Sequence, residues 1–225
     1  FQNNWSGTDE INAYLKPDQY LFGFPHMVGG GRTDHSIETI IFGGSSRTVI
    51  GEIDGKTSQR LMKIKALFDR SGMRPKISHK ITDWLITHYI QQSSGVGVFI
   101  KYGSARTVLE DLAKIKELCM AAREGLGVCK ARGISPIRIS PINMLYLPLF
   151  VLTRGFKSMF SDENEMAMIE GHMKHGIDEM IIGFYEVLET GRALNVPMVT
   201  WESLKPYVDE YCRERGCRYE QPKSG

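Results

Sequence analysis

The chain contains 225 residues, of which 42% are hydrophobic, 24% are charged and 10% are aromatic. This composition is that of an ordinary globular protein, and it excludes wholesale disorder and low-complexity architecture. The formal net charge is +2, from 28 basic and 26 acidic residues, so we expect no nucleic acid and no membrane among its partners. The length allows one large domain or two small ones with a core of adequate size.

The cysteine content and the apolar runs predict the cellular compartment. No CxxC pair occurs among the four cysteines, which are Cys119, Cys129, Cys212 and Cys217. We expect reduced thiols and a cytoplasmic protein. No run of 18 uncharged apolar residues is present, so no segment is expected to span a membrane. The chain opens with Phe1 instead of methionine, and we expect it to be part of a longer protein.

Residues 1–80 are expected to form an α/β unit. Helical patterns cover residues 8–15 and 57–70, and strands are expected over 20–24, 37–42, 48–53 and 75–78. The two middle strands flank Gly43-Gly44-Ser45-Ser46, which favours a β-hairpin between them. The glycines at positions 29–31 fit no phosphate-binding fingerprint, and we expect them to form a flexible loop.

The pattern changes at about residue 81, where helical spacing replaces β-rich runs. Five helices are expected, over residues 81–102, 105–132, 141–158, 163–194 and 200–215. Gly133 follows a long periodic run and suits the position after a helix end. We therefore predict two domains, comprising residues 1–80 and 81–225.

Polar residues in the first of these helices are candidates for chemistry. His88 has apolar neighbours, and the uncharged polar residues Gln91, Gln92, Ser93 and Ser94 follow it. Buried polar groups need partners, so this cluster indicates either a junction between helices or a wall that faces a ligand. Gly95 and Gly97 indicate a break in the helix or close packing.

A metal site is a further alternative for the fourth helix. His172, His175 and Glu179 share one helix face, and Glu170 lies nearby. A polar face that lines a cleft or meets solvent is the simpler interpretation, since no cysteine or third histidine converges there. We expect no metal. Methionines are frequent in this region and are expected to fill the core or to form a dimer interface: Met159, Met166, Met168, Met173 and Met180.

Several segments, in order and spacing, are similar to motifs of one enzyme family. They are Gln2 to Asn4, Ile50 to Gly55, Ile81 to Gly95, Ala121 to Gly133, Lys157 to Met159, Lys174 to Phe184 and Leu194 to Pro197. Together they resemble the ketopantoate reductase (2-dehydropantoate 2-reductase) family, over nearly the whole chain but only over the second part of a full-length member.

This resemblance implies a fold and a reaction. The fold is an α/β remnant of a Rossmann-type domain, without its GxGxxG half, followed by an all-α helical domain like the C-terminal domain of 6-phosphogluconate dehydrogenase. The reaction is the NADP-dependent reduction of a 2-oxo acid or related carbonyl to the alcohol. The partners implied are a small 2-oxo or hydroxy acid and a second copy of the chain in a homodimer. The chain alone is expected to be inactive.

The resemblance also implies site residues. Asn3 matches the asparagine near the nicotinamide and the substrate, which gives it a catalytic and a cofactor-binding role. Ser158 matches a serine that contacts the substrate carboxylate. Two asparagines of the family that bind substrate fall at Gln91 and Gly95.

The proton donor of the family is not matched directly. The family lysine falls at Thr87, and His88 is adjacent and could donate the proton if the helix register slips by one residue. The family glutamate falls at Ile177, with Asp178 and Glu179 beside it. We therefore predict catalytic roles for His88, Thr87 and Asp178. The missing lysine and glutamate also suit the alternative hypothesis of a non-catalytic ligand-binding or interaction module that keeps the fold.

Overall fold

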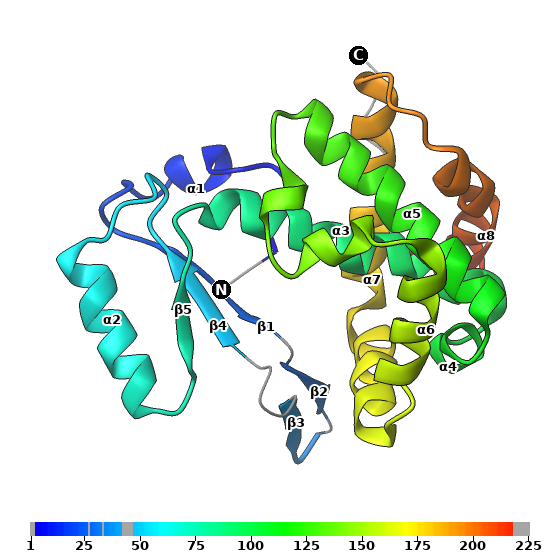
Figure 1. Cartoon of the computed structure of the whole chain (residues 1–225), viewed down its shortest axis with the longest axis horizontal. Helices are drawn as coiled ribbons and strands as arrows, with labels where there is room; N and C mark the ends of the chain where they lie inside the picture. Colours follow the sequence, from blue (N-terminus) through cyan, green and yellow to red (C-terminus); the bar gives the residue numbers. More distant parts are fainter. Residues whose placement is uncertain (1–2, 27, 33, 42–46, 218–225) are drawn as a thin grey trace.

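The computed structural model describes residues 3–26, 28–32, 34–41 and 47–217. In this part of the chain, the strands and the first two α-helices all precede residue 78, and only helices follow (Figure 1). The change of pattern expected near residue 80 is therefore confirmed. The molecule combines a small mixed sheet at one end with a larger group of helices at the other.

The mixed sheet has three strands in the order β1-β4-β5. Strands β1 (Phe22–His26) and β4 (Arg47–Gly51) are antiparallel, and β4 is parallel to β5 (Pro75–Ile77). Helix α2 (Gln59–Arg70) connects the two parallel strands, and Ser58 caps its start by accepting from the Leu61 amide at 3.1 Å. Helix α1 is a single short turn, Asp9–Asn12.

The predicted hairpin between residues 37–42 and 48–53 is wrong. Strand β3 (Ile37–Ile41) pairs with β2 (Val28–Arg32), and β4 pairs with β1. The chain thus runs outward as β1 and β2 and returns as β3 and β4. The glycines at 29–31, expected in a loop, lie within β2, where a strand without side chains allows close approach of a neighbour. The expected turn at 43–46 lies outside the described residues.

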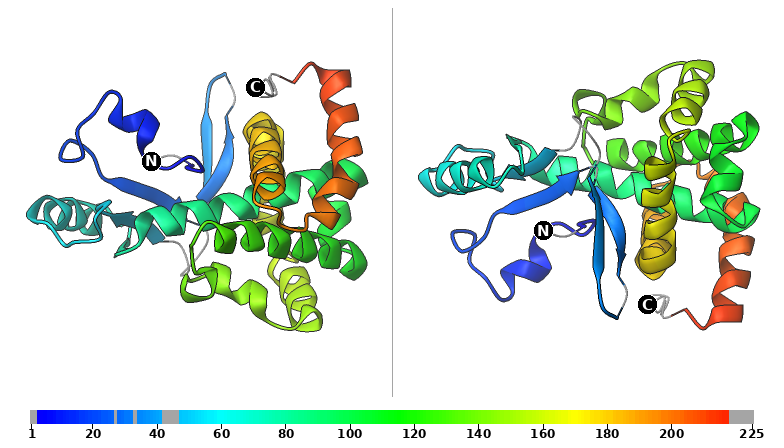
Figure 2. Two further views of the ribbon diagram at one scale, coloured as in Figure 1. Left: turned by 90° about the horizontal axis from the view of Figure 1, so that it is seen from above. Right: turned by 90° about the horizontal axis from the view of Figure 1, so that it is seen from below.

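The ribbon of β2 and β3 extends from the sheet and lies beside α7 (Glu163–Ala193), as Figure 2 shows. Helix α7 belongs to the second half of the chain, so the ribbon joins the two ends of the molecule. Strands β2 and β3 form a separate two-stranded sheet.

The five predicted helical segments are confirmed, with two interruptions. The helices are α3 (Ile81–Tyr102), α4 (Ala105–Leu109), α5 (Leu112–Ala131), α6 (Leu149–Met159), α7, and α8 (Val199–Arg215). Asp111 separates α4 from α5 because its carboxylate caps α5, accepting from the Ala113 amide at 2.8 Å. Pro148 similarly separates α6 from the 3₁₀ turn at Ile142–Tyr146. Gly133 has a φ of 83°, as expected after a helix end.

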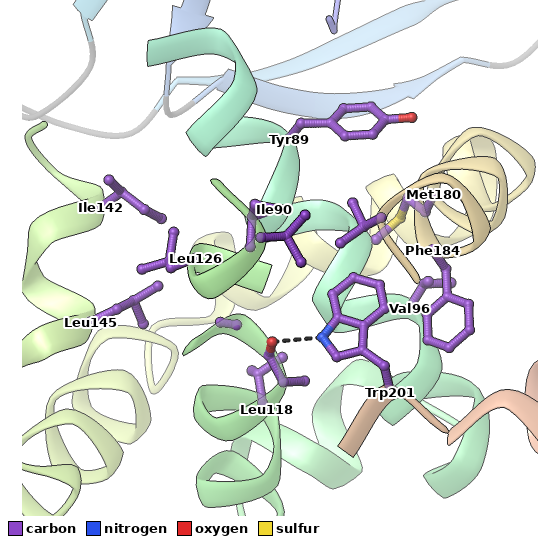
Figure 3. Packing of buried hydrophobic residues seen from close by; sticks show 14 of the residues in the cluster. Tyr89, Ile90, Val96, Leu118, Leu126, Ile142, Leu145, Met180, Phe184 and Trp201 are labelled. Carbon is purple, nitrogen blue, oxygen red and sulfur yellow. Dashed lines mark hydrogen bonds between the residues drawn. The ribbon is translucent and has the colours of Figure 1, made fainter. Parts of the chain in front are cut away.

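Helix α3 is the centre of the helical part, and it packs against α5, α7 and α8. Trp201 of α8 is completely buried there (Figure 3). Its ring stacks on Phe184 at 4.9 Å, and its indole nitrogen donates to the carbonyl of Ala121 at 2.7 Å. Buried residues of the sheet, such as Phe22 and Val49, belong to the same hydrophobic cluster. The division into two domains at residue 80 stays a prediction.

The methionines of α7 are mainly core residues. Met166, Met168 and Met180 are 2–7% exposed. This confirms core filling for these three side chains. Among the described residues, no helix combines the length and the apolar character that crossing a membrane requires.

Close packing of α3 on α7 depends on a glycine. A Cβ at Gly183 would lie 2.3 Å from Ser93 Oγ and 3.0 Å from the Tyr89 ring. We expect Gly183→Ala to lower the free energy of unfolding by about 1–3 kcal/mol, measured by urea denaturation, because the helices must separate. Gly176→Ala is the control in the same helix: nothing lies within 4 Å of its Cβ, and alanine should stabilise the protein by about 1 kcal/mol. Equal effects at both positions would contradict this account.

Candidate functional site

The segment at residues 3–7 is held against the helical part by Trp5, which is 7% exposed. The indole nitrogen donates to Thr190 Oγ1 of α7 at 3.0 Å, and the ring stacks on Tyr89 of α3 at 5.7 Å. Arg132, at the end of α5, places its guanidinium 4.4 Å from the ring centre and donates to the Trp5 carbonyl at 2.8 Å. Burial lowers the pKa of Arg132 from its ordinary value. Three helices therefore fix this segment.

Asn3 lies where this segment meets α3 and α7. Its side-chain amide nitrogen donates to Gln92 Oε1 at 3.2 Å and to Glu179 Oε1 at 2.7 Å. Asn3 is the residue expected near the nicotinamide and the substrate, and the structure places it at a junction of polar side chains from distant parts of the chain. We call Asn3, Gln92 and Glu179 the Asn3 cluster.

A pocket of about 190 Å³ opens beside the Asn3 cluster. Its lining comes from the anchored segment, from α3 and from α7: Asn3, Asn4, Trp5, Ser6, Gly7, Ile11, Tyr89, Glu179, Ile182 and Glu186. Glu186 Oε2 accepts a hydrogen bond from the Tyr89 hydroxyl at 2.6 Å. Glu179 and Glu186 are seven residues apart and share one face of α7. The pocket thus combines amides, hydroxyls and two carboxylates with the apolar side chains of Ile11 and Ile182.

His88 lies at the contact between the sheet and α3. Its half-buried imidazole stacks on Trp84 at 4.9 Å, with the rings 9° from parallel, and its centre is 4.3 Å from that of Phe24 in β1. Gln92 follows it by four residues, so the two side chains lie on the same face of α3. The aromatic contacts therefore hold the imidazole one helical turn from the Asn3 cluster.

Thr87 faces elsewhere. It is 1% exposed, and its hydroxyl lies 3.0 Å from the carbonyl oxygens of Asp83 and Trp84 in its own helix, to which it donates. The only proton of this hydroxyl is engaged by the preceding turn of α3. The structure therefore does not bring Thr87 to the Asn3 cluster.

Two further predicted residues each lie one position from the residue that contacts Asn3. Gln91 precedes Gln92, and Asp178 precedes Glu179. Consecutive helix residues point about 100° apart, so one position decides which side chain reaches a given partner. Gln92 was named only within the polar run at 91–94, and Glu179 only beside Asp178 and as a possible metal ligand, whereas the Tyr89 hydroxyl was not predicted. The spacing of four residues between His88 and Gln92 is the sequence signal that could have found Gln92.

Gly95 and Ser158 are also separate from the Asn3 cluster. Gly95 is buried, and a Cβ there would lie 3.0 Å from the Phe99 ring, so it serves close packing within α3. Ser158 is exposed near the end of α6, just before α7 begins at Glu163. Glu179 lies 16 residues further, about 24 Å along the helix. The structure therefore keeps Ser158 away from Asn3.

The alternative of a metal site at His172 and His175 finds no third ligand in the described part of the chain. No group of three or more His, Cys, Asp or Glu side chains is close enough to hold a metal ion there. His172 Nδ1 instead lies 2.9 Å from the carbonyl oxygen of Met168.

A larger depression, of about 280 Å³, lies between α5 and α8. Its lining residues are Ala113, Lys116, Glu117, Met120, Val199, Thr200 and Ser203. None of the predicted site residues is among them, so the pocket beside Asn3 is the better candidate for chemistry.

Comparison with known proteins gives similarity of structure without similarity of sequence. No family model and no curated protein matches the sequence. D-mandelate dehydrogenase solved with NADH matches with a TM-score of 0.66 and 12% identity, over 93% of this chain and 67% of that protein. A protein from Ralstonia solanacearum MolK2 assigned to the ketopantoate reductases matches with a TM-score of 0.60 and 20% identity.

The chain is structurally similar to these two kinds of enzyme over most of its length. The predicted resemblance is thus confirmed for the fold: a small three-stranded mixed sheet followed by a mostly helical region. The match to the Ralstonia protein covers 92% of this chain but only 59% of that protein. A second structure of D-mandelate dehydrogenase, with NADH and anilino(oxo)acetate, matches with a TM-score of 0.63 and 14% identity.

Proposed function

We propose that this chain is the substrate-binding part of an NAD(P)-dependent reductase that converts a 2-oxo acid or related carbonyl into the alcohol. The observation that carries the proposal is the Asn3 cluster, in which the predicted cofactor-side asparagine meets polar groups of α3 and α7. The similarity of fold to an enzyme solved with NADH and an oxo acid supports it. Within this proposal, residues 1–80 are the remnant of a Rossmann-type domain, residues 81–225 are the 6-phosphogluconate dehydrogenase-like domain, and the protein is a homodimer that uses NADP.

The residues present suit the nicotinamide end of such a cofactor. The side-chain nitrogen of Gln92 is buried and has no hydrogen-bond partner among the described residues. A carboxamide or carbonyl oxygen is an acceptor that would satisfy this donor. The 225 residues contain no GxGxxG sequence. In this proposal the pyrophosphate is therefore bound by another part of a longer protein. A bound nicotinamide supplies the hydride.

The chain's own residues then orient the carbonyl and supply a proton. The Gln92 side-chain nitrogen donates to the carbonyl oxygen, and Asn3 holds Gln92 in place by donating to its Oε1. His88 is the proposed general acid, since imidazole is the commonest side chain in that role and this ring lies one turn from Gln92. Its stacking on Trp84 fixes the direction in which it presents the proton.

Calorimetric titration with NADPH and NADH tests this function. We expect the product of the complete reading frame to bind one of them and to oxidise it in the presence of 2-oxo acids, whereas the 225-residue chain binds neither. Binding of neither cofactor by the longer product would overturn the proposal. Binding without oxidation across a broad panel of 2-oxo acids would favour the non-catalytic module, which the absence of the family lysine and glutamate also suggests.

A further inference from the structure

Two of the four cysteines meet at the end of helix α8. Gly216 follows the helix with a left-handed φ of 66°, and its amide donates to the Cys212 carbonyl at 2.9 Å. The Cys217 amide donates to the same carbonyl at 3.2 Å. In a helix ending of this kind, the residue after the glycine packs its side chain on the last turn of the helix. Cys217 therefore lies against Cys212.

The hydrogen bond from Cys217 to Cys212 limits how far apart the two residues can lie. Even with all bonds in line, its length of 3.2 Å and the standard bond lengths on either side place the two Cα atoms at most about 7 Å apart. A disulfide usually needs a Cα separation of roughly 4.4–6.8 Å. The two thiols also interact directly, and burial together with this interaction raises the pKa of Cys212. The two side chains thus point toward each other.

The Cys212 thiol is also in contact with α7. Both cysteines are half-buried and pack against the hydrophobic core. The hydroxyl of Tyr185 in α7 lies beside the Cys212 thiol and donates to Asp209 Oδ1 of α8 at 2.6 Å. The Cys212 sulfur therefore has a fixed position between two helices, and a bond from it to Cys217 would fix the end of α8.

The other two cysteines are arranged differently. Cys119 and Cys129 are buried in α5, ten residues and about 15 Å apart along the helix axis. A disulfide cannot span that distance. Burial raises the pKa of both thiols, and a thiol in such surroundings reacts poorly. They serve as internal controls for the pair in α8.

We propose that Cys212 and Cys217 form a disulfide bond when the protein meets an oxidising small-molecule disulfide, and that this bond fixes the end of α8 against the core. The four thiols are free in the structure, which is the reduced form. Neither Cys212 nor Cys217 lines the pocket beside Asn3, so the inference does not rest on the proposed function.

The reaction is an exchange in two steps. The Cys217 sulfur attacks the small disulfide, forms a mixed disulfide and releases one small thiol. The Cys212 sulfur then attacks the Cys217 sulfur and releases the second small thiol. The two cysteines lose two electrons and two protons, which end on the two released thiols. We assign the first attack to Cys217 because burial makes the thiolate of Cys212 scarce.

Incubation of the 225-residue chain with oxidised glutathione tests the pairing. Free thiols are then blocked with N-ethylmaleimide, and the chain is digested with trypsin without a reductant. Because Arg213 and Arg215 lie between the two cysteines, only the disulfide keeps the cleaved peptides together. Mass spectrometry should find peptides 193–213 and 216–218 joined, with Cys119 and Cys129 free. Glutathione retained on Cys217, a different cysteine pair or four free thiols would overturn the proposal.

Serine variants separate the roles of the two sulfurs. In Cys212→Ser, glutathione should stay on Cys217, because no second thiol is present to displace it. In Cys217→Ser, Cys212 should stay free of glutathione, and glutathione on Cys212 would contradict the order of attack. Cys119→Ala is the control in the core and should leave the joined peptides unchanged.

The melting temperature tests whether the bond fixes α8. Oxidation should raise it by about 2–8 °C in the unsubstituted chain, because the bond restricts the unfolded state. It should raise it in neither serine variant. No rise in the unsubstituted chain, or an equal rise in the serine variants, would show that the bond does not fix the helix end.

Discussion

Replacement of His88 by alanine is expected to lower the turnover of a 2-oxo acid by about 10²–10⁴-fold in the product of the complete reading frame. The reason is that the carbonyl oxygen must gain a proton as the hydride arrives. His88 is the proposed donor because its ring is fixed by Trp84 and Phe24 one turn from Gln92. Steady-state oxidation of the reduced cofactor measures the effect.

A second variant separates proton transfer from packing. His88→Phe keeps an aromatic ring between Trp84 and Phe24, and it should lose as much turnover as alanine while the melting temperature stays unchanged. Thr87→Val is the control at the neighbouring position, where the hydroxyl serves only the preceding helical turn. Undiminished turnover of either His88 variant would exclude this residue as the acid, and an equal loss in Thr87→Val would show that the effect is structural.

Replacement of Trp201 by alanine is expected to lower the free energy of unfolding by about 3–5 kcal/mol. The side chain is 0% exposed, and its loss leaves a cavity against Phe184 and removes the hydrogen bond to the Ala121 carbonyl. A Cβ on Gly125 would lie 2.7 Å from Ile90 and 3.4 Å from the Trp201 ring, so the absence of a side chain there lets α5 pack closely on this part of the core. Urea denaturation measures the loss.

Trp201→Phe isolates the hydrogen bond from the packing of the ring. Phenylalanine fills most of the space but cannot donate to Ala121, so a smaller loss of about 1–3 kcal/mol is expected. Losses of the same size in both variants would show that the hydrogen bond, and not burial of the ring, accounts for most of the stabilisation by Trp201. A loss below about 1 kcal/mol for alanine would contradict the central position of Trp201 in the core.

The helices could be predicted from the sequence because their signals are local. Hydrophobic spacing gave α3 over Ile81–Tyr102, and the interruption at Asp111 is itself a local capping signal. Strand pairing could not be predicted in the same way. The partner of β3 depends on how the whole ribbon passes α7, and a glycine-rich strand such as β2 carries no hydrophobic alternation to identify it.

The candidate site shows a similar limit at the level of single residues. Asn3 was found from a motif, whereas its partners Gln92 and Glu179 lie one position from the predicted Gln91 and Asp178. A motif comparison at low identity identifies the helical segment but can be in error by one residue. An error of one residue rotates the expected side chain by about 100° around the helix axis, so it changes which side chain is expected to meet Asn3. The Tyr89 and Glu186 pair depends on the distance between α3 and α7, which is set by packing at Gly183.

The anchoring of Trp5 by three helices has a consequence for cooperativity. The N-terminal part of the chain contacts the helices at three places. These are the anchored Trp5, the ribbon beside α7, and the ring contact between Phe24 and His88. Opening of the sheet end alone would expose the apolar faces of Trp5 and Trp84, so local unfolding there is costly. A ligand bound at Asn3 contacts both ends of the molecule, and by mass action it would protect the backbone amides of both from hydrogen exchange.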